Sequence, residues 1–170
     1  LLVRSKTLVD LKQKIIEKAG MINTYYMPAY KVEQIDNLST GYQFDVAMNT
    51  DKNYFLYNAA GGMVSTLSDM KKFVEWLRDS DYLVQMISNS LDCTIENGLD
   101  TKYGYGIIIA EDIFDTKMIG HGGTSFGFKS ELWFSQETGE IIIYFANDYM
   151  YNKNYSKFRK RMNKVLQKYR

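Results

Sequence analysis

Apolar residues recur at the three- or four-residue spacing of a helix face in three stretches of the chain. These positions are Leu8, Leu11, Ile15 and Ile16 in the first stretch, Met70, Phe73, Val74 and Leu77 in the second, and Phe158, Met162, Val165, Leu166 and Tyr169 in the third. The first predicted helix ends before Gly20, which suits a left-handed C-cap. The second begins at a capping box of Thr66 and Asp69, ends at residues 78–80, and is followed by a short predicted helix at 81–88.

Between these helices and the last one, the pattern changes to that of strands. Apolar residues at 103–110, a glycine-rich segment at 117–126 and strict alternation at 128–135 predict three strands. After a predicted turn at 137–139, the continuous apolar run at 140–146 predicts a central strand covered on both faces. Helices, then a strand meander, then a helix indicate an α+β fold, with an antiparallel sheet and flanking helices.

Composition places these elements in one unit. The 170 residues are 45% hydrophobic, so we expect a single domain over 1–170, with a long surface excursion at 21–58. The net charge of +1 argues against nucleic acid or an anionic membrane as a partner. No apolar run reaches the ~20 residues that span a bilayer. The first residue is Leu1 rather than Met, so we expect either that the N-terminus has been removed or that the chain belongs to a longer protein.

The chain has one cysteine, Cys93, and one histidine, His121. A single cysteine excludes a disulfide within the chain, and we interpret Cys93 as a buried or partly buried apolar residue rather than a nucleophile. Neither residue has the spacing of a metal-ligand motif, so we expect no metal and no other cofactor. The basic faces of the last predicted helix favour a solvated surface over a membrane role.

Five short blocks stand out along the chain. They are IIEKAGM with Asn23-Thr24, LSTGY at 38–42, AGGMVSTLSDM at 60–70 followed by Phe73, GHGGT at 120–124 with Gly127-Phe128 and Ser130, and FAN at 145–147. In this order they resemble segments of class C β-lactamases, D-Ala-D-Ala peptidases and related esterases. The resemblance covers nearly the whole chain. It implies the C-terminal part of a β-lactamase-like serine hydrolase domain of the penicillin-binding protein type.

The nucleophile of that family is the serine of a Ser-x-x-Lys motif, and its second element is Tyr-x-Asn. In the family both lie upstream of the first block, so the resemblance places them before Leu1. The chain itself contains no Tyr-x-Asn or Ser-x-Asn. Ser68 and Lys71 do have the Ser-x-x-Lys spacing. Because Ser68 falls in the first turn of the second predicted helix, we interpret it as an ordinary helix-start residue.

The fourth block resembles the segment that holds the third active-site motif of the family. His121, Gly122 and Gly123 take the positions of its Lys, Thr and Gly, and the Thr124 backbone N–H is the implied oxyanion donor. The resemblance implies that these residues bind substrate along an exposed strand edge, with His121 accessible. Asn147 matches a position that can help bind a substrate carboxylate, or it simply ends a strand. For His121 the alternative is a hydrogen-bonded histidine in a glycine-rich turn.

The implied function is acyl transfer through a serine ester, on peptidoglycan peptides, β-lactams or small esters. A histidine in place of the lysine removes a fixed charge, and Gly122 lacks a hydroxyl, so a peptidase or esterase-like activity is favoured over a true β-lactamase. We expect this chain alone to be inactive. The alternative is a non-catalytic binding or sensor module on the same scaffold. The resemblance also implies an extracytoplasmic location, with membrane or wall association, and an exposed apolar seam predicts self-association.

Overall fold

The computed structural model describes residues 10–26, 35–48, 61–95, 99–125, 127–148 and 155–170. The elements in chain order are the π-helical turn η1 (Lys12–Ile16), β1 (Tyr25–Tyr26), β2 (Tyr42–Gln43), β3 (Val46–Ala47), β4 (Met63–Val64), α2 (Leu67–Arg78), α3 (Asp81–Ser88), β5 (Leu91–Ile95), β6 (Leu99–Tyr103), β7 (Ile108–Ala110), β8 (Met118–Ser125), β9 (Phe128–Phe134), β10 (Ile141–Ala146) and α4 (Tyr155–Leu166). A six-stranded antiparallel sheet, in the order β10-β9-β8-β7-β6-β5, forms the centre. The antiparallel α+β prediction is therefore confirmed.

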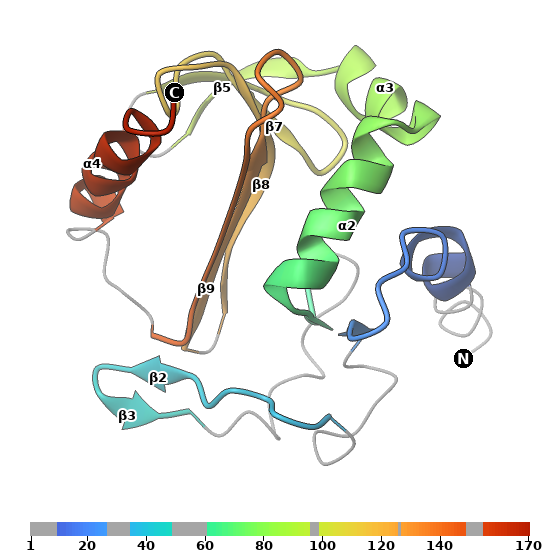
Figure 1. Ribbon diagram of the computed structural model, residues 1–170, viewed down its shortest axis with the longest axis vertical. Coiled ribbons are helices and arrows are strands. Elements are labelled where there is room, and N and C mark those ends of the chain that lie inside the picture. The colour runs from blue at the N-terminus through green and yellow to red at the C-terminus, as the bar shows by residue number, and fades with distance from the viewer. Residues whose placement is uncertain (1–9, 27–34, 49–60, 96–98, 126, 149–154) are drawn as a thin grey trace.

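The sheet lies between two layers of helices (Figure 1). On one face, side chains of α2 and α3 pack against the sheet in a buried cluster that includes Val74, Leu83 and Phe134. On the other face, Met162 and Leu166 of α4 pack against a second cluster. Alternation along each strand sends successive side chains to opposite faces, which is how one sheet supplies both cores.

Helix α2 begins where the sequence indicates. The hydroxyl of Thr66 accepts a hydrogen bond from the Asp69 amide at 3.1 Å, which satisfies one of the unpaired donors of the first turn. Gly62, before the cap, has a φ of 80°, a left-handed conformation that glycine adopts without strain. Helix α3 begins at Asp81 and ends at Ser88, the bounds that the sequence predicts.

The side chain of Asp69 does not turn back to the cap, as a full capping box would require. Its carboxylate is completely buried and accepts hydrogen bonds from the Asn23 amide at 2.7 Å and the Thr24 hydroxyl at 3.0 Å, while Lys72 pairs with its other oxygen at 3.1 Å. Burial acts to raise the pKa of Asp69, but these hydrogen bonds and the Lys72 charge outweigh it, so the pKa lies below its usual value. Asp69 thus anchors the segment before β1 to the start of α2.

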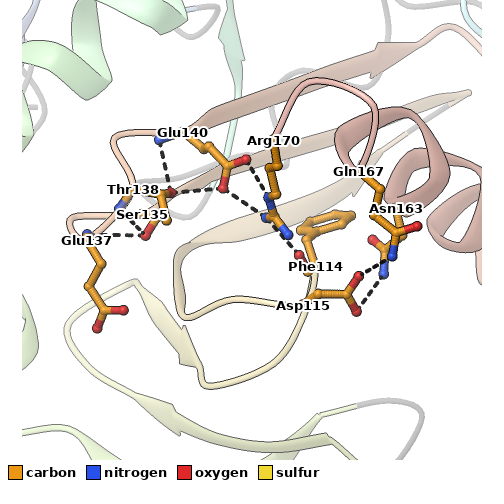
Figure 2. Close-up of polar contacts among 9 residues, drawn as sticks. All are labelled: Phe114, Asp115, Ser135, Glu137, Thr138, Glu140, Asn163, Gln167 and Arg170. Carbon is orange, nitrogen blue, oxygen red and sulfur yellow. Dashed lines mark hydrogen bonds and ion pairs between the residues drawn. The ribbon is translucent and has the colours of Figure 1, made fainter.

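The last residue, Arg170, ties the end of the chain to the sheet (Figure 2). Its guanidinium donates to both carboxylate oxygens of Glu140, at 2.7 and 2.8 Å, and to the carbonyl of Phe114 at 2.9 Å. These hydrogen bonds from Arg170 outweigh burial and hold the pKa of Glu140 below its usual value. Nearby, Gln167 donates to the Asp115 carboxylate at 3.1 Å. The C-terminal segment is therefore held by directed polar contacts as well as by packing.

Two elements differ from the prediction, β10 in its position and α4 in the width of its apolar face. The run at 140–146 forms β10, which is a terminal strand of the described sheet rather than a central one. Its sequence is continuously apolar because both faces of the strand are covered. Ile141 packs on the α2 side, and Ile142 packs on the α4 side. In α4, Val165 is 46% exposed, and Tyr169 beyond the helix is 86% exposed. The predicted apolar stripe is therefore narrower than the sequence suggests.

The first predicted helix is described only in part, because Leu8 lies outside the described residues. Its described portion is the short turn η1, and Gly20 beyond it has a φ of 67°, as expected for a left-handed residue. The hairpin of β5 and β6 is absent from the sequence prediction, which starts the strands at Tyr103. The Asn97-Gly98 pair, a common hairpin dipeptide, was the available signal.

Candidate functional site

Strand β8 changes its neighbours midway along its length. Residues Met118–Gly120 pair with β7, and this ladder ends at the Ile108–Gly120 pair. From Ile119 to Ser125 the strand pairs with β9 on its other side. No strand of the described chain pairs with residues 121–124 on the β7 side. This stretch of β8 is therefore a one-sided strand edge, the arrangement that the sequence predicts for the fourth block.

His121 lies on this edge and is exposed, as expected. Its Nε2 atom lies 2.9 Å from the hydroxyl of Tyr103, and its Nδ1 atom lies 2.5 Å from the carbonyl oxygen of Gly122. The Tyr103 ring meets the imidazole edge-on, with centroids 5.7 Å apart. Tyr103 comes from β6, two strands away from β8, and sequence reasoning missed it. No local signal indicates this contact, because it depends on where β7 begins between the two strands.

Gly122 and Gly123 face side chains of β9 across the ladder. A Cβ atom on Gly122 would lie 2.9 Å from both carboxylate oxygens of its partner Glu131. A Cβ atom on Gly123 would lie 2.8 Å from the hydroxyl oxygen of Ser130. From the sequence, glycine is expected at these positions because it leaves the strand edge accessible. The structure adds a second reason, namely that β9 already fills the space a side chain would need.

Glu131 is a buried carboxylate directly behind the candidate edge, and sequence reasoning missed it too. Only 5% of the residue is exposed. Its oxygens pair with Lys129 at 2.9 Å and accept from the Trp133 indole N–H at 2.8 Å. Burial raises the pKa of the neighbouring Tyr144 hydroxyl, and the negative charges of Asp148 and Glu131 add to this effect. Strict alternation with Trp133 and Lys129 was visible in the sequence, but the burial of Glu131 was not.

Asn147 follows β10, which β9 separates from β8. Its side-chain amide donates to the carbonyl of Thr40 at 3.0 Å, and its own carbonyl accepts from the Tyr42 amide at 2.9 Å. Gly127, with a φ of 82°, also accepts from Tyr42, and a Cβ atom on Gly127 would clash with the Gly41 backbone at 2.6 Å. The second and fifth sequence blocks therefore meet at the end of the sheet.

The Ser-x-x-Lys spacing at Ser68 does not form a nucleophile–base pair in this structure. Ser68 lies in the first turn of α2, and the ammonium of Lys71 donates to Glu75 one turn further on. Asp69, between them in sequence, points into the core. The described geometry agrees with the interpretation of Ser68 as a helix-start residue.

Within the described ranges, no three His, Cys, Asp or Glu side chains gather as metal ligands would. None of the helices in the same ranges has the length and apolar character needed to cross a membrane. Cys93 is partly buried on β5, with its sulfur 3.2 Å from the Thr101 hydroxyl.

The family model described as Beta-lactamase matches residues 7–166. The chain belongs to the Beta-lactamase family. Penicillin-binding protein 4* of Bacillus subtilis (strain 168) is 24% identical to it, over 81% of this chain and 34% of that protein. The resemblance to serine β-lactamases and penicillin-binding proteins is thereby confirmed. The chain spans about a third of the length of this curated relative.

Solved structures show the same fold. An octameric penicillin-binding protein homologue from Pyrococcus abyssi has a TM-score of 0.70 and 22% identity, over 86% of this chain and 35% of its own. A D-amino acid amidase from Ochrobactrum anthropi SV3, complexed with D-phenylalanine, has a TM-score of 0.68 and 24% identity, over 92% of this chain and 52% of its own. A D-stereospecific amidohydrolase from Streptomyces sp. has a TM-score of 0.67 and 18% identity, over 81% of this chain and 42% of its own. The chain thus has a β-lactamase/transpeptidase-like fold, and it covers between 35% and 52% of these three structures.

Proposed function

We propose that this chain is the C-terminal part of a serine acyl-transfer hydrolase, and that it supplies one wall of the active-site cleft. The nucleophile and its base come from a preceding part of the same protein. The observation that supports this most directly is the one-sided edge of β8 at residues 121–124, in a chain of the Beta-lactamase family. Such an edge offers backbone N–H and C=O groups to an extended, peptide-like substrate.

Each residue of the edge has a role in this proposal. The backbone N–H of Thr124 helps to stabilise the oxyanion of the tetrahedral intermediate. Gly122 and Gly123 let the substrate approach the strand, since no Cβ atom stands in the way. His121 offers a polar contact in place of the charged lysine of many relatives. For Asn147 the hydrogen bond to the Thr40 carbonyl favours the alternative, which is that this residue ends a strand.

The proposed substrates are peptidoglycan peptides, β-lactams or small esters. A peptidase or esterase-like activity is favoured over β-lactam hydrolysis, because residues 121 and 122 lack the ammonium and the hydroxyl that would hold a substrate carboxylate. Such substrates fit an extracytoplasmic protein associated with the membrane or the cell wall. Self-association stays a prediction; the exposed apolar residues Ile22, Met63 and Leu67, all near the start of α2, are consistent with it.

The proposal is tested by comparing this chain with a longer protein that includes the residues before Leu1. Both are incubated with a fluorescent penicillin and a chromogenic ester. We expect no covalent label and no turnover with the chain alone, because it holds neither nucleophile nor base. We expect labelling of the longer protein, and its loss when the serine of an upstream Ser-x-x-Lys motif is replaced by alanine.

Two results would contradict this proposal. Labelling of the chain alone that disappears in Ser68→Ala would place the nucleophile in α2. A longer protein whose upstream region lacks both motifs, and which neither reacts nor hydrolyses, would favour the alternative of a binding or sensor module. Lys71→Ala checks the same point, since it removes the other half of the apparent motif without changing Ser68. Labelling by a true Ser68–Lys71 pair would fall in this variant too.

A further inference from the structure

Both ring nitrogens of His121 are engaged by groups of this chain. The carbonyl oxygen of Gly122 can only accept a hydrogen bond, so the proton between it and Nδ1, 2.5 Å away, belongs to Nδ1. In a neutral imidazole, Nε2 then carries a lone pair and accepts. The Tyr103 hydroxyl, 2.9 Å from Nε2, must therefore donate to it. The contacts select one tautomer and one hydroxyl orientation.

We propose that Tyr103 is a positioning residue that holds His121 in its Nδ1–H tautomer, and that the Tyr103 oxygen is the polar group this pair presents to a substrate. Both protons of the neutral pair are committed, one to Gly122 and one to Nε2. The hydrogen-bonding capacity that remains for a substrate is that of the lone pairs on the Tyr103 oxygen. Tyr103 is 42% exposed. The pair is thus an acceptor with no donor to spare.

The acceptor oxygen of Tyr103 also bears on which substrates fit, and here the inference rests on the proposed function. An acceptor oxygen at the cleft edge complements an N–H donor, such as a substrate ammonium or amide group. A carboxylate needs a donor instead. To supply one, the pair would first take up a proton at Nε2, so that Nε2–H donates to the Tyr103 oxygen and the hydroxyl proton turns to the carboxylate. The neutral pair therefore favours substrates with an ammonium or amide group beside the acyl centre.

The scaffold holds Tyr103 in place for this role. Tyr103 pairs with Ile108, which in turn pairs with Gly120, so the register of three strands sets its position beside His121. The next residue, Gly104, lies so close to α3 that a Cβ atom would be 2.0 Å from the Met86 carbonyl oxygen. A side chain on a rigid, packed strand keeps its geometry better than one on a loop.

The tautomer is measured by NMR of the imidazole nitrogens in the 15N-labelled chain. His121 is the single histidine, so both imidazole nitrogen signals belong to it, and their different couplings to the two ring C–H protons tell Nδ1 from Nε2. At a pH where the ring is neutral, we expect a protonated Nδ1 and an unprotonated Nε2. Tyr103→Phe removes the donor to Nε2, so the population should shift toward the Nε2–H tautomer. Tyr105→Phe, the same change at an exposed tyrosine two residues away, should shift nothing.

Either of two results would overturn the positioning role. One is a wild-type chain in which the Nε2–H tautomer predominates. The other is a tautomer population that Tyr103→Phe leaves unchanged, or that Tyr105→Phe changes equally. Backbone amide spectra of both variants report whether the fold is retained. If Tyr103→Phe does not fold, Tyr103→Leu serves as a second variant that offers no hydrogen-bond donor to Nε2.

The substrate class is tested in the longer protein with two matched anilides, β-alanine p-nitroanilide and succinic mono-p-nitroanilide. They differ by an ammonium against a carboxylate at the same position. Tyr103→Phe should lower kcat/KM for the ammonium substrate about tenfold, the loss of one hydrogen bond to a charged group, with less than about a twofold change for the carboxylate. Equal losses on both substrates, or none, would overturn this part. If the wild type hydrolyses the chromogenic ester but cleaves neither anilide, the inferred substrate class is overturned while the proposed function stands. If it neither hydrolyses the ester nor takes the penicillin label, the proposed function fails, and the NMR result still decides the Tyr103–His121 pair.

Discussion

Residues Met118–Gly120 and His121–Thr124 are successive halves of one strand, and β9 runs beside both. The first half also pairs with β7 and is buried, with Met118 at 0% and Ile119 at 4% exposure. The second half has no β7 beside it; His121 and Thr124 are exposed, and Gly122 and Gly123 are partly exposed. The difference comes from β7, which begins at Ile108 after a turn at Gly106, where φ is 70°. One strand can thus be core and then open edge when its neighbour is shorter.

Three glycines straddle this boundary, and the atoms that face them differ in how easily they can move. A Cβ atom on Gly120 would meet the backbone of β9, one on Gly122 would meet the end of a buried carboxylate, and one on Gly123 would meet a hydroxyl. Backbone in a paired strand can shift least, and a hydroxyl can rotate away. A series of alanine substitutions therefore measures how rigid each half of β8 is.

Gly120→Ala should have the largest effect on stability. The added Cβ atom would lie 2.0 Å from the Leu132 carbonyl oxygen and 2.8 Å from the Trp133 Cα atom, and neither can move without breaking the β8–β9 ladder. We expect a loss of about 3 kcal/mol or more in the free energy of unfolding, at the upper end for overpacking. Urea unfolding followed by circular dichroism measures it. An unchanged midpoint would mean that the closed half of β8 is not tightly packed.

Gly122→Ala should cost about 1–3 kcal/mol, because the carboxylate of Glu131 can move, but only by disturbing its contacts with Lys129 and Trp133. A double-mutant cycle with Glu131→Ala separates this clash from other causes. Glu131→Ala is itself destabilising, since the buried Trp133 N–H loses its acceptor. In that background, Gly122→Ala should cost less than about 0.5 kcal/mol. Costs that simply add would show that Glu131 is not the reason for glycine at this position.

Sequence signals predicted the elements whose cause is local. The Thr66 cap and Asp69 lie within four residues, and α2 and α3 follow as expected. Alternation and the glycine-rich run likewise predicted β9 and β8. The resemblance located the edge at His121, since it compares whole blocks in order.

What the sequence could not predict depends on tertiary placement. The position of β10 at the end of the sheet follows from strand order, which a pattern of apolar residues does not encode. The contact of Tyr103 with His121 joins strands that are not neighbours and depends on where β7 begins. Likewise, Glu131 has the charge of a surface residue and is buried only because Lys129 and Trp133 pair with it.

Gly123→Ala should have the smallest effect on stability and so tests the open half of β8. Its Cβ atom would lie 2.8 Å from the Ser130 hydroxyl oxygen, which a rotation of the Ser130 side chain relieves, so we expect a cost below about 1 kcal/mol. In Ser130→Ala, the same substitution should cost nothing measurable by urea unfolding. The added methyl group also stands on the edge that the proposed function assigns to substrate, so labelling of the longer protein by a fluorescent penicillin should fall although the fold is retained. A stability loss as large as that of Gly120→Ala would place the boundary between core and edge beyond Gly123, and the one-sided edge would then be too short to hold a substrate.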